Sequence, residues 1–202
     1  MKKIILGLVV SLGTSGVVQA AGGDPQAGKE HTAVCTACHG PVGNSVVPNF
    51  PKLAGQGEEY LVKQMQDIKS GERNVLEMTG MLNNLSDQDI ADISAFYASQ
   101  TVSGGQVNPE HITLGGKLYR GGDLDRRVPA CSACHTPTGK GNRLAKFPQL
   151  SGQHPDYIGK TLRDFREGVR VNDGDTRIMR TIAEKLSNKE IDALASYVSG
   201  LH

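Results

Sequence analysis

All four cysteines of this 202-residue chain lie in two short motifs, and a histidine directly follows each motif's second cysteine. The motifs are Cys35-Thr36-Ala37-Cys38-His39 and Cys131-Ser132-Ala133-Cys134-His135. Two thiols three positions apart can each form a thioether with one vinyl group of the same porphyrin, and the adjacent imidazole then reaches the iron. The spacing therefore predicts two covalently attached c-type haems, with His39 and His135 as axial ligands of the iron.

Paired cysteines also occur in thioredoxin-like dithiols, in zinc sites and as structural disulfides. Neither motif lies in a βαβ pattern, and both carry the additional histidine. The gap between Cys38 and Cys131 is much longer than the spacing within a zinc ribbon. Haem attachment is therefore favoured, while zinc, disulfide and dithiol chemistry stay open as alternatives.

Residues 1–20 have the features of a secretory signal peptide. Lys2 and Lys3 precede an apolar run from Ile4 to Val10, and short residues lead to Ala20. The continuous apolar run is too short to span a bilayer, so cleavage after Ala20 is favoured over a membrane anchor. We therefore expect an exported, soluble mature chain in a compartment outside the cytosol.

The sequence repeats itself, because the second motif follows the first at a distance of 131 − 35 = 96 positions. The segment Pro51-Lys52-Leu53-Ala54-Gly55-Gln56 likewise returns as Pro148-Gln149-Leu150-Ser151-Gly152-Gln153. A linker rich in glycine, asparagine and proline separates the two copies. We therefore predict two domains in the mature chain, at residues 21–103 and 104–202.

Both halves show the periodicity of helices. Each opens with an N-cap and proline, has a central apolar stripe that ends at a glycine, and closes with a capping signature. The matched residues are Asp24-Pro25 and Asn108-Pro109; Leu61, Met65, Ile68, Gly71 and Ile158, Leu162, Phe165, Gly168; Ser86, Asp89 and Ser187, Glu190. Strand-like alternation is absent, so an all-α fold is predicted. Halves this small would have thin cores without haem, so we expect the apoprotein to fold poorly.

The repeat also identifies a pair of candidate methionine ligands. Met179 is the single methionine of the second half, and the local offset of 187 − 86 = 101 positions places Met78 opposite it. Met65 and Met81 align with other apolar residues, as expected of core residues. The remaining histidines lack counterparts and are expected at surface or capping positions: His31, His111, His154 and His202. Histidine and methionine together fill both axial positions, which suits one-electron transfer.

Over essentially its whole mature length the chain resembles the di-haem cytochrome c4 family. The likeness rests on the tandem motifs and on the segments 49–56, 77–80, 172–175 and 186–189. It implies two class I cytochrome c domains related by a pseudo-twofold axis, with their haems close across the interface. The implied ligand sets are Cys35, Cys38, His39 and Met78 for the first haem, and Cys131, Cys134, His135 and Met179 for the second. The loop from Gly71 to Met78 is shorter than in familiar members.

The resemblance implies a periplasmic carrier that passes single electrons from a quinol-oxidising complex toward a terminal oxidase, often loosely held at the inner membrane. It also implies that the carbonyl groups of Pro51 and Pro148 accept a hydrogen bond from the axial histidines, with a rigid turn as the alternative role. Other function classes stay open: a di-haem peroxidase, the cytochrome subunit of a dehydrogenase, or a gas sensor. The matching methionines argue against an iron with an open position.

Charge is distributed unevenly between the halves. Residues 21–105 carry 5 basic and 10 acidic side chains, and residues 106–202 carry 15 and 11. The opposite net charges, −5 and +4, would help the halves to dock and predict a higher reduction potential for the second haem. The basic residues are scattered without interleaved aromatic residues, which argues against nucleic-acid binding.

Overall fold

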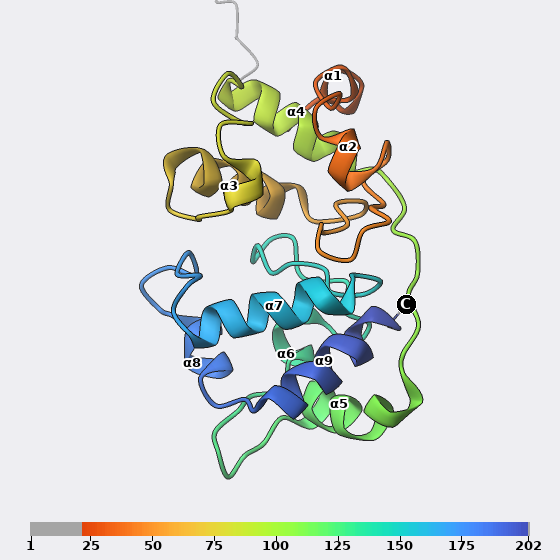
Figure 1. The fold of residues 1–202 in the computed structure, drawn as a ribbon, viewed down its shortest axis with the longest axis vertical. Helices are drawn as coiled ribbons and strands as arrows, with labels where there is room; N and C mark the ends of the chain where they lie inside the picture. Colours follow the sequence, from red (N-terminus) through yellow and green to blue (C-terminus); the bar gives the residue numbers. More distant parts are fainter. Residues whose placement is uncertain (1–21, 202) are drawn as a thin grey trace, which may run out of the picture.

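The computed structural model describes residues 22–201, so the predicted signal peptide and His202 lie outside the described residues. The chain forms two helical halves, one above the other in Figure 1, and a linker runs between them along one side. Between residues 22 and 201 the only β-type pairing is two isolated bridges, Asp123 with Val128 and Asn142 with Phe147. The predicted all-α class is confirmed.

The first half consists of four α-helices and one turn of 3-10 helix. They are α1 (Pro25–Glu30), α2 (Thr36–His39), α3 (Glu58–Ser70), η1 (Leu76–Met78) and α4 (Asp87–Ala98). The first and last helices, α1 and α4, pack across each other, and α3 packs against α4. This arrangement leaves α2, which carries the first haem motif, beside α1 and α4 (Figure 1).

The second half repeats this architecture, with a longer first helix and a short α-helix in place of the 3-10 turn. They are α5 (Pro109–Gly121), α6 (Ser132–His135), α7 (Pro155–Arg166), α8 (Ile178–Ala183) and α9 (Asn188–Ser199). Its first and last long helices, α5 and α9, pack together, and α7 packs on both α8 and α9. The second motif, on α6, therefore has the same surroundings as the first.

Local capping interactions set the helix ends as the sequence predicts. The side chains of Asp24 and Asn108 accept hydrogen bonds from the first turns of α1 and α5. Complete capping boxes begin α4 at Ser86 and α9 at Ser187. Gly71 ends α3 in the left-handed conformation, with φ of 86°, which a residue without a side chain adopts at low cost.

Each half has its own hydrophobic core, and a motif cysteine packs against each one. The first core consists of Leu61, Ile93, Phe96 and Tyr97, with Met65 and Cys35 at its edge. The second is larger, includes Tyr119, Ile191 and Tyr197, and has Cys131 at its edge. Met65 is therefore a core residue, as predicted.

The two halves meet through polar contacts with pseudo-twofold symmetry. Arg73 donates to the hydroxyl of Tyr157 at 3.1 Å, and Arg170 donates to the hydroxyl of Tyr60 at 3.1 Å. Every ion pair found within residues 22–201 joins two residues of the same half. The expectation that opposite net charges dock the halves thus has no ion pair to support it, because each of these two hydrogen bonds joins a charged arginine to an uncharged tyrosine hydroxyl.

Candidate haem-binding sites

Both haem motifs fold as a single helical turn that begins at the first cysteine. Cys35 is the N-cap residue of α2 and Cys131 is that of α6. None of the four cysteines is joined to another in a disulfide. Among the described residues, no three or more His, Cys, Asp or Glu side chains form a group that could hold a metal ion, so the zinc alternative lacks a ligand set.

The motif histidines are buried and held by the proline loops. The Nδ1 atoms of His39 and His135 lie 2.9 Å from the carbonyl oxygens of Pro51 and Pro148, respectively. A carbonyl group can only accept a hydrogen bond, so Nδ1 carries the proton in each ring. The predicted role of the two prolines as acceptors is confirmed.

This geometry suits the binding of iron by the second ring nitrogen. Each histidine is only 7% exposed, and burial lowers the pKa of both rings while the proline carbonyls oppose that shift. A neutral imidazole with its proton on Nδ1 presents the lone pair of Nε2, which is the form that ligates a metal. The surroundings of His39 and His135 therefore fit an axial haem ligand.

Burial acts on the first thiol of each motif before any haem is attached. Burial raises the pKa of the Cys35 thiol, and it raises that of Cys131 to about 11. Both sulfurs therefore keep their protons at neutral pH and are less reactive than exposed thiolates. Thioether formation adds the S–H bond across the vinyl double bond and needs no separate oxidant. The donor set fits covalent haem.

Met78 and Met179, the two candidate ligands, are less exposed than Met81. Met78 lies at the end of η1 and Met179 in the first turn of α8, and both side chains are half-buried. Met81, three residues beyond Met78, is 48% exposed, so the expectation that it is a core residue is wrong. These positions agree with the assignment of Met78 and Met179 as a matched pair, which stays a prediction.

Sequence reasoning did not single out the aromatic residue that precedes each proline. The ring of Phe50 lies 6.4 Å from that of His39, and the ring of Phe147 lies 6.2 Å from that of His135. Phe50 and Phe147 recur at the 97-position offset of the proline segments, and this regularity could have identified them. They place an apolar ring beside each imidazole.

The other histidines of the described range lie elsewhere. His31 is exposed and pairs with Asp89 at 3.4 Å. His154 was expected at a surface or capping position; it is the N-cap residue of α7, but its ring contacts Ser45 of the first half at 2.9 and 3.0 Å. It is therefore an interface residue, and the sequence alone did not indicate this.

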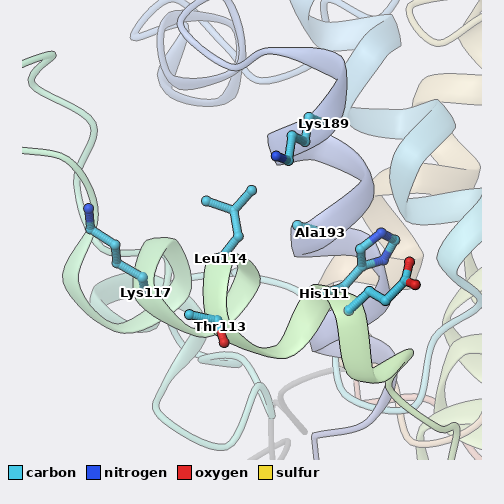
Figure 2. Close-up of a pocket in the computed structure, with 7 residues that line it drawn as sticks. His111, Thr113, Leu114, Lys117, Lys189 and Ala193 are labelled. Atoms are coloured by element: carbon cyan, nitrogen blue, oxygen red, sulfur yellow. The ribbon is translucent and has the colours of Figure 1, made fainter.

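A groove of about 510 Å³ lies between α5 and α9, and it contains none of the predicted ligands. Figure 2 shows Leu114 of α5 and Ala193 of α9 at this groove, with Lys117 and Lys189 beside it. His111 also lines it, and its buried Nδ1 atom has no hydrogen-bond partner. The residues with haem chemistry are thus in the motif helices and proline loops, away from this groove.

Comparison with known proteins agrees with the geometry. Residues 25–101 and 114–202 match the family model of cytochrome c, which places the two halves in the class of c-type cytochromes. The chain is 57% identical over 202 residues to cytochrome c4 of Pseudomonas aeruginosa, and the match covers all of both chains. The chain belongs to the cytochrome c4 family.

Two other relatives are informative. The crystal structure of reduced recombinant cytochrome c4 from Pseudomonas stutzeri has a TM-score of 0.88 and 59% identity, and the match covers 89% of this chain and 100% of that chain. A thiosulfate dehydrogenase electron acceptor from Stutzerimonas stutzeri is 34% identical over 202 residues, covering 96% of this chain and 92% of that protein.

The family establishes the cofactors and the broad role. The chain is a di-haem c-type cytochrome of electron transfer, with two covalently attached haems. Bound haem supplies an iron that changes between two oxidation states. No helix within residues 22–201 combines the length and apolar character needed to cross a membrane.

Proposed function

We propose that this protein is a periplasmic carrier of single electrons between respiratory-chain components, from a quinol-oxidising complex toward a terminal oxidase. The role we infer is transfer alone, without catalysis by the haems. The protein would be exported by its first 20 residues and would associate with the inner membrane only peripherally.

The proposal assigns a complete ligand set to each domain, with the domains at residues 21–103 and 104–202. Cys35 and Cys38 would hold the first haem by thioethers, with His39 and Met78 on its iron. Cys131 and Cys134 would hold the second, with His135 and Met179 on its iron. Two protein ligands per iron leave no open position for oxygen or peroxide, which favours a carrier over an enzyme or a gas sensor.

The observation that carries this proposal is that the two motif histidines have matching environments. Both rings are buried to the same extent, and both donate to a proline carbonyl at 2.9 Å. A di-haem peroxidase needs one haem that can lose a ligand, so its two sites should differ. The same support on both sides fits two haems with the same task.

Optical spectroscopy of the purified holoprotein tests the coordination. We expect the weak methionine–Fe(III) charge-transfer band for both haems in the oxidised protein, and no carbon monoxide binding in the reduced protein. Carbon monoxide binding by either native haem would contradict the carrier proposal. Oxidation of the reduced protein by membranes that contain a terminal oxidase then tests the direction of transfer.

The similarity to a thiosulfate dehydrogenase electron acceptor supports a second candidate, an electron acceptor of a dehydrogenase. In that case the donor would be a dehydrogenase instead of a quinol-oxidising complex. Stopped-flow reduction by thiosulfate dehydrogenase with thiosulfate, compared with reduction by a quinol-oxidising complex, separates the two. The donor that reduces the protein faster, at equal haem concentration, is the one that the function requires.

A further inference from the structure

Each half places one buried glutamine against the proline loop of the other half. The Oε1 atom of Gln153 accepts from the backbone N–H of Lys52 at 2.8 Å, and its Nε2 atom donates to the Lys52 carbonyl at 2.8 Å. Likewise, Oε1 of Gln56 accepts from the backbone N–H of Gln149 at 2.8 Å, and its Nε2 atom donates to the Gln149 carbonyl at 3.0 Å. The glutamines are 6% and 7% exposed, so water does not compete for these bonds.

The peptide group that each glutamine contacts is the one that holds an axial histidine. The nitrogen of Lys52 and the carbonyl of Pro51 belong to a single peptide unit. A continuous chain of hydrogen bonds therefore runs from the Nδ1–H of His39 through the carbonyl of Pro51 and the N–H of Lys52 to Oε1 of Gln153. This chain begins in the first half and ends in the second.

The other motif histidine begins a chain of hydrogen bonds that is related to the first by the pseudo-twofold axis. It runs from the Nδ1–H of His135 through the carbonyl of Pro148 and the N–H of Gln149 to Oε1 of Gln56. The pseudo-twofold relation thus exchanges the glutamines, so that each half supplies the last acceptor for the histidine of the other half.

The glutamine amides are fixed in orientation. Oε1 of Gln56 also accepts from the N–H of Gly57 at 2.9 Å, and Oε1 of Gln153 also accepts from the N–H of His154 at 3.0 Å. Both donors stand directly before a helix, α3 and α7. Because each oxygen already faces two N–H donors, the amide cannot rotate without losing both bonds.

Such a chain has a predictable effect on the iron. Hydrogen bonds in series polarise one another, by about 10–30% per bond, so a peptide whose N–H donates has a stronger carbonyl acceptor. A stronger acceptor at Nδ1 raises the basicity of the imidazole as a metal ligand. Greater electron donation to the iron stabilises the oxidised state and lowers the reduction potential.

We propose that Gln153 is a positioning residue for the first haem and Gln56 is one for the second. Each half of the molecule then sets part of the reduction potential of the haem in the other half. The inference rests on the proposed function, in which His39 and His135 are axial ligands.

The test replaces each glutamine by a methionine in the holoprotein, which keeps the length but removes the amide. Gln153→Met should shift the reduction equilibrium of the first haem threefold to tenfold toward the reduced form and leave the second unchanged. Gln56→Met should shift the second haem by the same factor toward the reduced form and leave the first unchanged. At about 59 mV per tenfold change, the expected rise is about 30 to 60 mV. Redox titration with the haems resolved by NMR measures both.

A second readout follows the hydrogen bond directly. In the reduced, diamagnetic protein the Nδ1 proton of His39 should move upfield in Gln153→Met, while that of His135 keeps its shift. Gln153→Glu keeps an oxygen acceptor at Lys52 and should lower the first potential instead of raising it. Opposite shifts for the Met and Glu variants distinguish tuning from loss of packing.

Tyr60→Phe is the matched control, because it removes one hydrogen bond between the halves, from the Arg170 guanidinium, without touching a proline peptide. It should leave the Nδ1 protons of both motif histidines unshifted. The inference is overturned if each glutamine variant shifts the haem of its own half, shifts both equally or shifts neither. A native protein without methionine bands would instead refute the proposed function.

Discussion

Gly28 of α1 faces the backbone carbonyl of Asp92 on α4 so closely that a Cβ atom on Gly28 would lie 1.9 Å from that oxygen. The matching place in the second half is Gly115, whose Cβ would lie 2.3 Å from the carbonyl oxygen of Ala193. Glycine therefore permits the close crossing of the first and last helices in both halves.

We expect Gly28→Ala to reduce the free energy of unfolding of the first half by about 3 kcal/mol, because a backbone carbonyl cannot move aside as a flexible side chain can. Denaturant unfolding of the holoprotein, followed by circular dichroism, measures the change. Gly104→Ala is the control, since no atom lies within 4 Å of its added Cβ. Equal stability of the two variants would show that α1 and α4 can separate without cost.

Substitution of the methionines tests the axial ligands. Met78→Ala should remove the methionine–Fe(III) band of the first haem and let that haem bind carbon monoxide, and Met179→Ala should do so for the second. The exposed Met81 supplies the control, and Met81→Ala should leave both spectra unchanged. If Met81→Ala removed the methionine–Fe(III) band of the first haem and Met78→Ala kept it, Met81 would be the ligand instead of Met78.

The uneven charge predicts an order of the two potentials. Reduction adds one negative charge to a haem, so the second half, at +4, should hold its electron more tightly than the first, at −5. We expect the second haem to be higher by about 59 mV, a tenfold preference. Salt should reduce the gap, because surface charges are screened over about 8 Å at physiological ionic strength.

Redox titration at low and high salt measures this gap, and the Met78 and Met179 variants assign the two waves. The glutamine effect proposed above acts through bonds inside the interface, so its size should not depend on salt. A higher potential on the first haem, or a gap that salt does not change, would contradict the charge argument.

Glu190 makes the stability of the second half depend on pH. Hydrogen bonds from Arg126 and from Ser187 hold the pKa of this carboxylate at about 2, below its usual 4.5. A depressed pKa contributes stability that is present above the unfolded-state pKa and is lost as the pH falls toward 2. Glu190→Gln should therefore cost about 1 kcal/mol at pH 7, as the loss of a helix cap does.

Urea unfolding at several pH values measures the difference between native protein and variant. That difference should be full at pH 7, shrink below about pH 4.5 and vanish near pH 2. Glu184→Gln is the control, because Glu184 is exposed and forms no ion pair within the described part of the chain. A cost for Glu190→Gln that stays constant with pH would rule out this contribution.

The haem should also be needed for folding of each half. Replacing Cys35 and Cys38 together by alanine removes both attachment points of the first haem, and we expect the first half to lose most of its helical structure. The reason is that the first core has few large buried residues. The second half should keep its haem spectrum. Far-ultraviolet circular dichroism and the pyridine haemochrome measure both. A fully helical first half without haem would contradict the expectation.

Local rules made much of the fold predictable from the sequence. The N-caps at Asp24 and Asn108 and the capping boxes at Ser86 and Ser187 depend on residues a few positions apart, so the sequence shows them directly. The haem chemistry is equally local, because each motif carries its thiols and its imidazole within five consecutive residues. The repeat then extended every such prediction from one half to the other.

Net charge was a poor guide to the interface. It sums over a whole surface, whereas docking depends on the few groups that meet, and these include Arg73 and Arg170 bonded to tyrosine hydroxyls. Both arginines and both tyrosines recur in the sequence at a constant offset. That regularity marks them as structurally equivalent, but it does not say whether they face their own half or the other.

The same holds for Gln56 and Gln153, which the sequence shows only as the last residues of a repeated segment. Their bonds join residues 93 and 101 positions apart, and such contacts depend on how two separately folded bodies dock. Local propensity has no bearing on that docking, because the proline loop that each glutamine contacts belongs to the other half. The link from His39 to Gln153 therefore exists only in the tertiary structure, where the two proline loops lie against each other.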